Sequence, residues 1–203
     1  MSTNEKIDLR VRRTRLSLQG ALEELMAEKP YQEITVSEIV DRALVARPTF
    51  YLHYETKDYL LNSLIDDLFA DFQTEVKREW SCQYMDLERF GLLLIIEGEK
   101  NAERLRILIN SGLEYLLLKQ ICTVLTNLIT EVRDADSLAL HEMVIQPYIV
   151  DFAAGGFFML LKRWIEDDLA MSSESLGLMV GEIAKTFRHI LRDWPLQKPS
   201  VAW

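Results

Sequence analysis

Residues 34–61 read ITVSEIVDRALVARPTFYLHYETKDYLL, and this stretch decides how the N-terminal part of the chain folds. It opens with Thr35-Val36-Ser37-Glu38, a Thr-x-x-Glu capping box that predicts a short helix ending near Ala43. A turn through Leu44-Val45 then leads to a second short helix. Pro48 suits the first turn of that helix, where a missing N–H costs little. Two short helices joined by a tight turn are therefore predicted.

The flanking sequence also predicts helices. Between Leu9 and Ala27, apolar residues recur at the three- and four-residue spacing of one buried stripe. These residues are Leu16, Leu18, Ala21, Leu22, Leu25 and Met26. Lys29-Pro30 ends this helix, because the residue before a proline is pushed out of the helical region. Thr56 can cap a longer amphipathic helix that follows.

The rest of the chain continues in the same pattern. Helices are expected over residues 86–97, 102–110, 113–132, 138–145, 148–167 and 173–192. Pro147 is expected to end or kink the helix before it. No alternating strand pattern and no Asn-Gly or Asp-Gly hairpin occurs in the sequence. The predicted fold class is all-α.

Composition limits the possible partners. The 203 residues are 49% hydrophobic and 27% charged, which excludes a disordered chain. The net charge is −9, of which −1 belongs to residues 1–60 and −8 to the remainder. Residues 10–15 nevertheless carry four arginines and no acid. An acidic chain is a poor general binder of polyanions, so any contact with nucleic acid must use a local patch.

The chain is expected to be cytoplasmic, with no membrane partner. Met1 to Arg10 is polar and contains no signal-peptide core. The longest apolar run, Phe152 to Leu161, is far short of the roughly 20 residues that a membrane crossing needs. Cys82 and Cys122 form no disulfide framework and match no zinc spacing.

Three helices within residues 9–55, two of them very short, match a helix-turn-helix module. In the second short helix, Arg47 and Thr49 lie at the outer tip, where arginine can reach guanine and threonine a thymine methyl. Phe50 is expected to point inward. Tyr51 falls next to Arg47, one turn further along the helix.

Phosphate contacts are expected around this tip. The amide end near Thr35 and Ser37 and the ammonium group of Lys57 can each hold a phosphate. His53 alone would more often be a surface or packed histidine than a DNA contact. The positions of Tyr51, Tyr54 and Lys57 around His53 favour a DNA contact.

Residues 34–61 resemble the TetR family of bacterial transcriptional regulators. The motif F-Y-L-H-Y followed by K-D-x-L-L is similar to the corresponding motif of the DhaS-like branch of that family. The strong resemblance covers about residues 10–62. A weaker one covers Phe152 to Trp164, which includes Gly155-Gly156, and then Ser173–Leu178.

The resemblance implies a DNA-binding domain over residues 1–56 and a helical effector-binding and dimerisation domain over residues 57–203. It implies a homodimer that binds a palindromic double-stranded DNA operator as a repressor and responds to a small-molecule effector. The predicted DNA-binding residues are Arg12, Arg13, Arg15, Thr35, Ser37, Arg47, Thr49, Tyr51, His53, Tyr54 and Lys57.

Three positions depart from the family pattern. Leu44 stands where many members have glycine, and Leu52 replaces a residue that is commonly polar. Ala46 occupies the usual Ser or Thr cap position, which weakens the helix end by about 1 kcal/mol. These departures concern base preference and affinity. They leave open a second interpretation, an adaptor of the same fold that binds a protein partner and little DNA.

Gly155-Gly156 lies inside a predicted helix, where each glycine costs roughly 1 kcal/mol, and close approach of a partner helix is the simplest reason for it. Two apolar stripes there are predicted to close a bundle of two chains, with core packing inside one subunit as the alternative. The stripes are Phe152, Gly156, Leu160 and Trp164, and Leu176, Val180, Ile183, Phe187 and Leu191.

The effector pocket is predicted from aromatic and methionine side chains, each of which taken singly is more often plain core. They are Trp80, Tyr84, Phe90, Tyr115, Met143, Tyr148 and Met159. No enzyme, cofactor or metal site is expected. The acid pairs Asp66-Asp67 and Asp167-Asp168 diverge by about 100° on a helix, which favours solvated faces. His141 and His189 are interpreted as structural.

Overall fold

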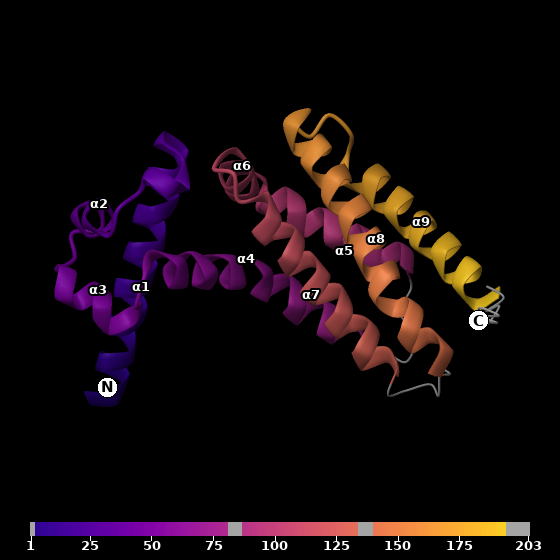
Figure 1. Cartoon of the computed structure of the whole chain (residues 1–203), viewed down its shortest axis with the longest axis horizontal. Coiled ribbons are helices and arrows are strands. Elements are labelled where there is room, and N and C mark those ends of the chain that lie inside the picture. The colour runs from indigo at the N-terminus through magenta and orange to yellow at the C-terminus, as the bar shows by residue number, and fades with distance from the viewer. Residues whose placement is uncertain (1–2, 81–86, 134–139, 194–203) are drawn as a thin grey trace, which may run out of the picture. The chain divides into compact units, whose positions relative to one another are not determined.

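The computed structural model describes residues 3–80, 87–133 and 140–193, and every regular element in these ranges is a helix (Figure 1). The predicted all-α fold class is therefore confirmed. In chain order the elements are α1 (Thr3–Glu28), η1 (Tyr31–Glu33), α2 (Val36–Arg42), α3 (Arg47–His53), α4 (Lys57–Trp80), α5 (Leu87–Lys100), α6 (Ala102–Asn110), α7 (Glu114–Arg133), α8 (Leu140–Glu166) and α9 (Ser173–Asp193).

Contacts divide the chain into two compact units. One unit comprises Met1–Asp71 and Asn101–Leu117, and the other comprises Phe72–Lys100 and Leu118–Trp203. The first unit therefore holds α6 in addition to the N-terminal helices, and α4 runs from one unit into the other. None of the described helices combines the length and the apolar character that crossing a bilayer requires.

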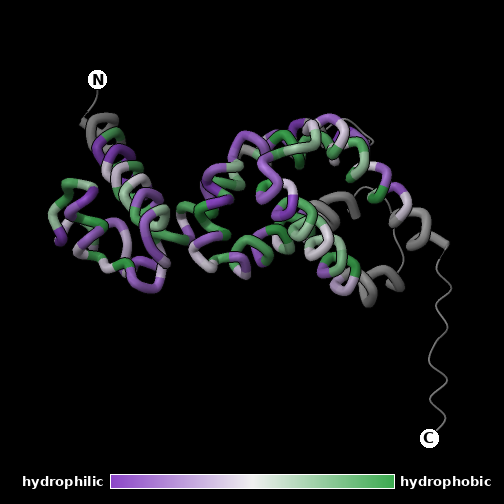
Figure 2. Tube along the Cα trace, turned by 90° about the horizontal axis from the view of Figure 1, so that it is seen from above, coloured by the Kyte–Doolittle hydropathy of each residue, from purple (hydrophilic) through white to green (hydrophobic). Residues whose placement is uncertain are grey.

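The core of the first unit forms where apolar faces of α1, α3 and α4 meet. Leu18 and Leu22 of α1, Phe50 of α3 and Leu60 of α4 are all 0% exposed. The spacing of four between Leu18 and Leu22 is that of one helix face, and hydrophilic and hydrophobic residues alternate along these helices (Figure 2). Leu16 is 59% exposed, because two residues from Leu18 is nearly the opposite side of a helix.

The turn between α2 and α3 follows a standard helix ending. The N–H of Val45 donates to the carbonyl of Val40 at 2.9 Å, and that of Leu44 donates to Asp41 at 3.3 Å, which together form a Schellman motif. Leu44 closes this motif with a φ of 55°, a region where a side chain costs roughly 1–2 kcal/mol. The departure from glycine noted in the sequence therefore falls on the residue that needs a left-handed backbone.

Capping of the two short helices is unequal. The Thr35 hydroxyl accepts from the N–H of Glu38 at 3.3 Å, and the Glu38 carboxylate accepts from the N–H of Thr35 at 2.9 Å, so the predicted capping box is present. Ala46 caps α3 without any side-chain hydrogen bond, and Pro48 lies in the first turn. The start of α3 is held by its backbone and by packing alone.

In the second unit, α5 and α9 pack backbone to backbone. A Cβ atom placed on Gly91 would lie 2.5 Å from the carbonyl oxygen of Gly177 and 2.5 Å from the nitrogen of Gly181. Lys185 of α9 also forms an ion pair with Glu88 of α5. Only residues without a side chain permit this approach, so the pattern Gly177-x-x-x-Gly181 is required by packing.

One sequence expectation in this unit stays a prediction, and another needs correction. Close approach of a partner helix is predicted at Gly155-Gly156, and within the described part of one chain nothing lies within 4 Å of a Cβ placed on either glycine, so a contact with a second chain stays a prediction. Separate helices were expected over residues 138–145 and 148–167, whereas α8 continues through Pro147 as one helix. A proline removes only one backbone donor, and the hydrogen bonds on either side keep the helix continuous.

Gly181→Ala is predicted to destabilise the protein by about 1–3 kcal/mol, because a methyl group has no room between α5 and α9. Gly20→Ala is the matched control, since nothing lies within 4 Å of a Cβ there. It should gain up to about 1 kcal/mol from helix propensity. Urea unfolding followed by circular dichroism measures both changes. A Gly181→Ala variant as stable as Gly20→Ala would contradict the packing.

Candidate nucleic-acid interface

Helix α3 is placed by one buried side chain. Phe50 is 0% exposed, and its ring contacts the ring of Tyr51 edge-on, with a centroid distance of 5.3 Å. Each residue of a helix is turned by about 100° from the last, so the burial of Phe50 fixes where every other side chain of α3 points. Arg47 and Tyr51 lie on one flank, and Thr49 and His53 lie on the other.

Arg47 and Tyr51 form an exposed pair. The guanidinium carbon of Arg47 lies 5.9 Å from the centre of the Tyr51 ring, and its Nη2 is 3.5 Å from the Tyr51 hydroxyl. Tyr51 is 48% exposed. The stacking orders the arginine without using up its remaining N–H donors. A guanidinium held in this way is suited to a base edge or a phosphate.

Tyr54 was predicted to bind DNA, and the structure corrects this. Its side chain is 6% exposed and packs against Phe50, with a ring-centre distance of 6.0 Å. The Tyr54 hydroxyl accepts a hydrogen bond from Nε of Arg15 at 3.1 Å and lies 3.4 Å from the Ser63 hydroxyl. Tyr54 is therefore a core residue that ties the end of α3 to α1 and α4.

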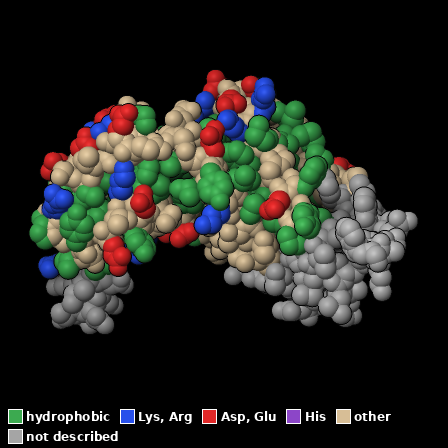
Figure 3. Space-filling view, in the orientation of Figure 1, with side chains coloured by type: hydrophobic (Ala, Val, Ile, Leu, Met, Phe, Trp, Pro, Cys, Tyr) green, Lys and Arg blue, Asp and Glu red, His purple; other side chains and the backbone are tan. Residues whose placement is uncertain are grey.

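Arg15 is exposed and stays a predicted phosphate contact, although its guanidinium also bonds within the chain. In addition to Tyr54, its Nη2 donates to the Ser63 hydroxyl at 2.9 Å, and the hydrogen bond to Tyr54 raises the pKa of Arg15. Its guanidinium therefore faces α4. Arg12 and Arg13 are exposed on α1 and stay predicted phosphate contacts. In the space-filling view, basic and hydrophobic side chains adjoin on the surface of the N-terminal helices (Figure 3).

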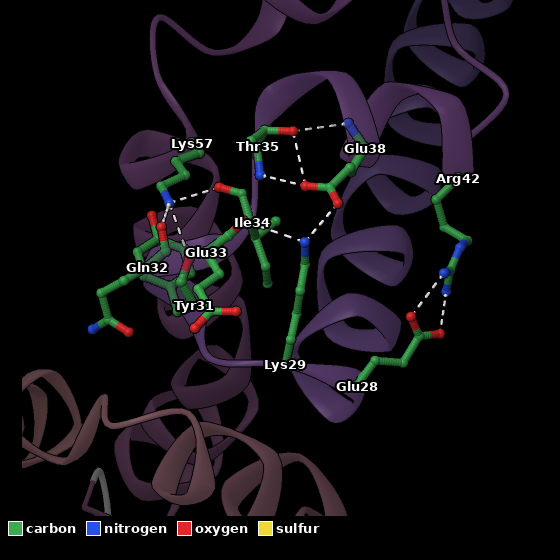
Figure 4. A network of polar contacts seen from close by, with 10 residues as sticks. All are labelled: Glu28, Lys29, Tyr31, Gln32, Glu33, Ile34, Thr35, Glu38, Arg42 and Lys57. Carbon is green, nitrogen blue, oxygen red and sulfur yellow. Dashed lines mark hydrogen bonds and ion pairs between the residues drawn. The ribbon is translucent and has the colours of Figure 1, made fainter.

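Lys57 was predicted to hold a phosphate, but its ammonium group binds the chain itself (Figure 4). Nζ donates to the carbonyls of Tyr31, Gln32 and Ile34 at 2.9, 3.2 and 2.7 Å. An ammonium has three donors, so all of them are used. Nζ also lies 4.4 Å from the centre of the Tyr31 ring. We call this set of contacts the Lys57 clamp, and it fastens η1 to the start of α4.

A second contact strengthens the same junction. The hydroxyl of Tyr31 donates to the carboxylate of Asp58, the residue after Lys57. Burial raises the pKa of Tyr31 well above its ordinary value, and the hydrogen bond to Asp58 adds to the rise. Tyr31 therefore stays neutral and donates at any physiological pH. Sequence reasoning missed Tyr31, whose only signal was an aromatic residue directly after Lys29-Pro30.

The start of α2 is held by an ion pair as well as by its capping box. Nζ of Lys29 lies 2.5 Å from Oε1 of Glu38. Together with the hydrogen bonds from Thr35, this lowers the pKa of Glu38 to about 2. The Thr35 hydroxyl is engaged in the cap, and Thr35 and Ser37 are both exposed. Thr35, Ser37 and His53 stay predicted phosphate contacts. Thr49 stays a predicted base contact, and both Thr49 and His53 are partly buried.

The residues of the predicted dimer interface divide into two groups. Phe152 and Ile183 are 66% and 45% exposed, and Gly156 is also exposed. Trp164 and Leu176 are each 4% exposed within one chain, and the indole N–H of Trp164 donates to the carbonyl of Met171. The structure thus assigns these two to the core of the chain. Leu160 and Val180 are partly buried, and the side chains of Phe187 and Leu191 lie outside the described residues.

Most of the described side chains of the predicted effector pocket lie on the surface. Tyr115 and Tyr148 are 74% exposed and Met159 is 59% exposed, so they are surface residues of a single chain. Phe90 is partly buried, with its ring centre 6.3 Å from that of Phe72. Tyr84 and the side chains of Trp80 and Met143 lie outside the described residues. The pocket stays a prediction.

Comparison with known proteins agrees with this geometry. Residues 20–64 match the model of the bacterial regulatory proteins of the tetR family. Over 68 residues the chain is 45% identical to the uncharacterized HTH-type transcriptional regulator YxbF of Bacillus subtilis (strain 168), covering 33% of this chain and 18% of YxbF. Over 91 residues it is 31% identical to the transposon Tn10 TetC protein of Escherichia coli, covering 42% of this chain and 46% of TetC. The match thus spans less than half of each relative.

Solved structures extend the likeness of fold over most of the chain. The TetR transcriptional regulator from Streptococcus agalactiae 2603V superimposes with a TM-score of 0.63 at 23% identity, covering 89% of this chain and 98% of that one. The dihydroxyacetone kinase operon activator DhaS gives 0.57 at 20% identity, covering 87% and 97%. The chain therefore has the TetR-like fold. Its N-terminal part carries the helix-turn-helix domain of tetR family regulators.

Lys57→Met is predicted to weaken DNA binding without changing the dependence of log K on log salt, because the Lys57 clamp uses all three donors. Arg13→Ala, which removes an exposed arginine of α1, should reduce that slope by about 0.9 for each phosphate that the arginine neutralises. Fluorescence anisotropy from 50 to 300 mM salt, on a duplex selected by the protein from random sequences, measures both slopes. An equal reduction by Lys57→Met would show that Lys57 binds a phosphate instead.

Glu38→Gln is predicted to destabilise the protein at neutral pH and to lose this effect in acid. The pKa of Glu38 lies at about 2 instead of its ordinary 4.5, so its contribution is full above 4.5 and disappears as the pH falls from 4.5 toward 2. Urea unfolding between pH 7 and pH 3 should show the gap to wild type narrowing. Glu55→Gln, an exposed position outside the network, is the control. A gap that does not depend on pH would refute the assignment.

Proposed function

We propose that the chain is a dimeric transcriptional regulator of the TetR family that binds a palindromic operator through α3 and represses transcription until a small-molecule effector binds. The observation that carries this proposal is the exposed Arg47–Tyr51 pair, held on a helix whose inner side is fixed by Phe50. The pair lies inside the segment that matches the family, residues 20–64.

The distribution of charge supports a local approach to DNA. The chain carries a net charge of −9, and a body of this sign is repelled by phosphates. Residues 47–53 of α3 contain no acid, and Arg10, Arg12 and Arg13 are exposed on α1. These two helices therefore offer exposed cations to a duplex, in contrast to the acidic remainder of the chain.

Twofold pairing is supported by apolar surface on α8 and α9. Phe152 and Ile183 are exposed large hydrophobic residues, and Gly155-Gly156 leaves space above α8 that nothing in the described part of the chain fills. A second copy packed on this face would bury both features. Two α3 helices related by a twofold axis would then lie about 34–36 Å apart, one turn of the duplex.

The finer parts of the proposal rest on the resemblance. We propose that the helices after the helix-turn-helix hold the effector, and that the chain belongs to the DhaS-like branch. The likeness to DhaS at 20% identity supports the fold alone. DhaS is described as an activator, so the direction of regulation is tested separately, by transcription from the bound promoter with and without the protein.

The predicted outcome of selection from random duplexes is a palindrome with half-sites about one helical turn apart, bound by two chains. Arg47→Ala combined with Tyr51→Ala should weaken this binding at least tenfold, since a bidentate base contact contributes about 1–3 kcal/mol. Lys119→Ala on α7 removes a positive charge elsewhere and should have no effect. Anisotropy gives the affinity, and analytical ultracentrifugation gives the stoichiometry.

A different result would identify the alternative function. If the purified protein selects no sequence at low salt and instead retains a protein partner, it is an adaptor of the same fold. If the double variant binds as tightly as wild type, α3 does not read DNA. Either outcome would overturn the proposal.

A further inference from the structure

The outermost part of α3 is apolar. With about 100° per residue, Pro48 and Leu52 lie about 160° and 200° from Phe50, on the side directly away from the core. Leu52 is 82% exposed, and Pro48 is also exposed. A leucine in this position gains little from the hydrophobic effect within the chain, so its side chain is available to contact a binding partner.

The surroundings of Leu52 indicate what it binds. Arg47 and Tyr51 stand along one side of it, and Thr49 and His53 along the other, so an apolar strip one residue wide lies between polar side chains. A protein partner requires a wider hydrophobic patch. The floor of the major groove offers a matching pattern, because hydrogen-bonding base edges surround single apolar groups, the C5-methyl groups of thymine.

We infer that Leu52, supported by Pro48, reads thymine methyl groups near the centre of each half-site, and that Leu52 is a specificity-determining residue. The inference rests on the proposed function. It also revises the expected role of Thr49, which is partly buried on the flank of α3 and lies farther from the groove-facing side. Arg47 and Tyr51 then bind beside the methyl contact.

The chemistry defines which bases are discriminated. Uracil has the same hydrogen-bonding edge as thymine and lacks only the methyl group, so a thymine-to-uracil exchange isolates the apolar contact. Removing one buried methyl group should weaken binding roughly threefold to fourfold. In a dimer the contact occurs twice, so exchange in both half-sites should weaken binding about tenfold.

The experiment uses the full chain and a duplex that it selects from random sequences. Thymines are replaced by deoxyuracil one symmetric pair at a time, and affinity is measured by anisotropy for wild type, Leu52→Ala and Leu44→Ala. Leu44 is 93% exposed in the turn before α3, so its variant likewise removes an exposed leucine and is the matched control. Circular dichroism checks that each variant is folded.

We expect at least one thymine pair at which uracil weakens wild type and Leu44→Ala about tenfold, while Leu52→Ala binds both duplexes equally. The inference is overturned if no thymine pair is sensitive, or if Leu52→Ala keeps the full thymine preference. Either result leaves operator binding intact, and so separates this failure from that of the proposed function. A chain that selects no duplex would refute the proposed function itself.

Discussion

The burial of Phe50 is the constraint on which the rest of the candidate site depends. A helix of seven residues is far too short to be stable in water alone, and α3 has no side-chain cap at Ala46. It persists because Phe50 and Tyr54, one turn apart on the same face, are buried against α1 and α4. Once this inner face is fixed, the 100° rotation per residue leaves no freedom in the direction of Arg47, Tyr51 or Leu52. The geometry of the outer face is thus a consequence of packing on the inner one.

Much of this arrangement could be predicted from the sequence, because it depends on residues that are close together along the chain. The capping box at Thr35, the inward Phe50 and the pairing of Arg47 with Tyr51 all follow from helix periodicity and side-chain chemistry. The burial of Tyr54 was also predictable, since it lies four residues from Phe50. The predicted DNA contact at Tyr54 conflicts with this spacing.

Other features carry no local signal. The local sequence around a lysine at the start of a helix does not show whether its ammonium group binds a phosphate or three carbonyls of its own chain. Only the fold of η1, which brings the carbonyls of Tyr31, Gln32 and Ile34 together, decides between the two. The glycines show the same limit. The sequence drew attention to Gly155-Gly156, whereas the close approach within the chain occurs at Gly177 and Gly181. This contact could not be predicted, because its partner helix α5 is remote in sequence.

The first unit extends beyond the helix-turn-helix because α6 is fastened to α1. Nε of Arg104 lies 2.6 Å from the carboxylate of Glu23, and the buried hydroxyl of Ser111 donates to the carbonyl of Met26 at 3.2 Å. Met26 lies in the last turn of α1, and the next element along the chain is η1, which the Lys57 clamp holds. Any displacement of α6 must therefore break these two hydrogen bonds or move the end of α1 with it. A boundary drawn after residue 56 separates elements that these contacts join, so the physical unit presenting α3 to a duplex includes α6.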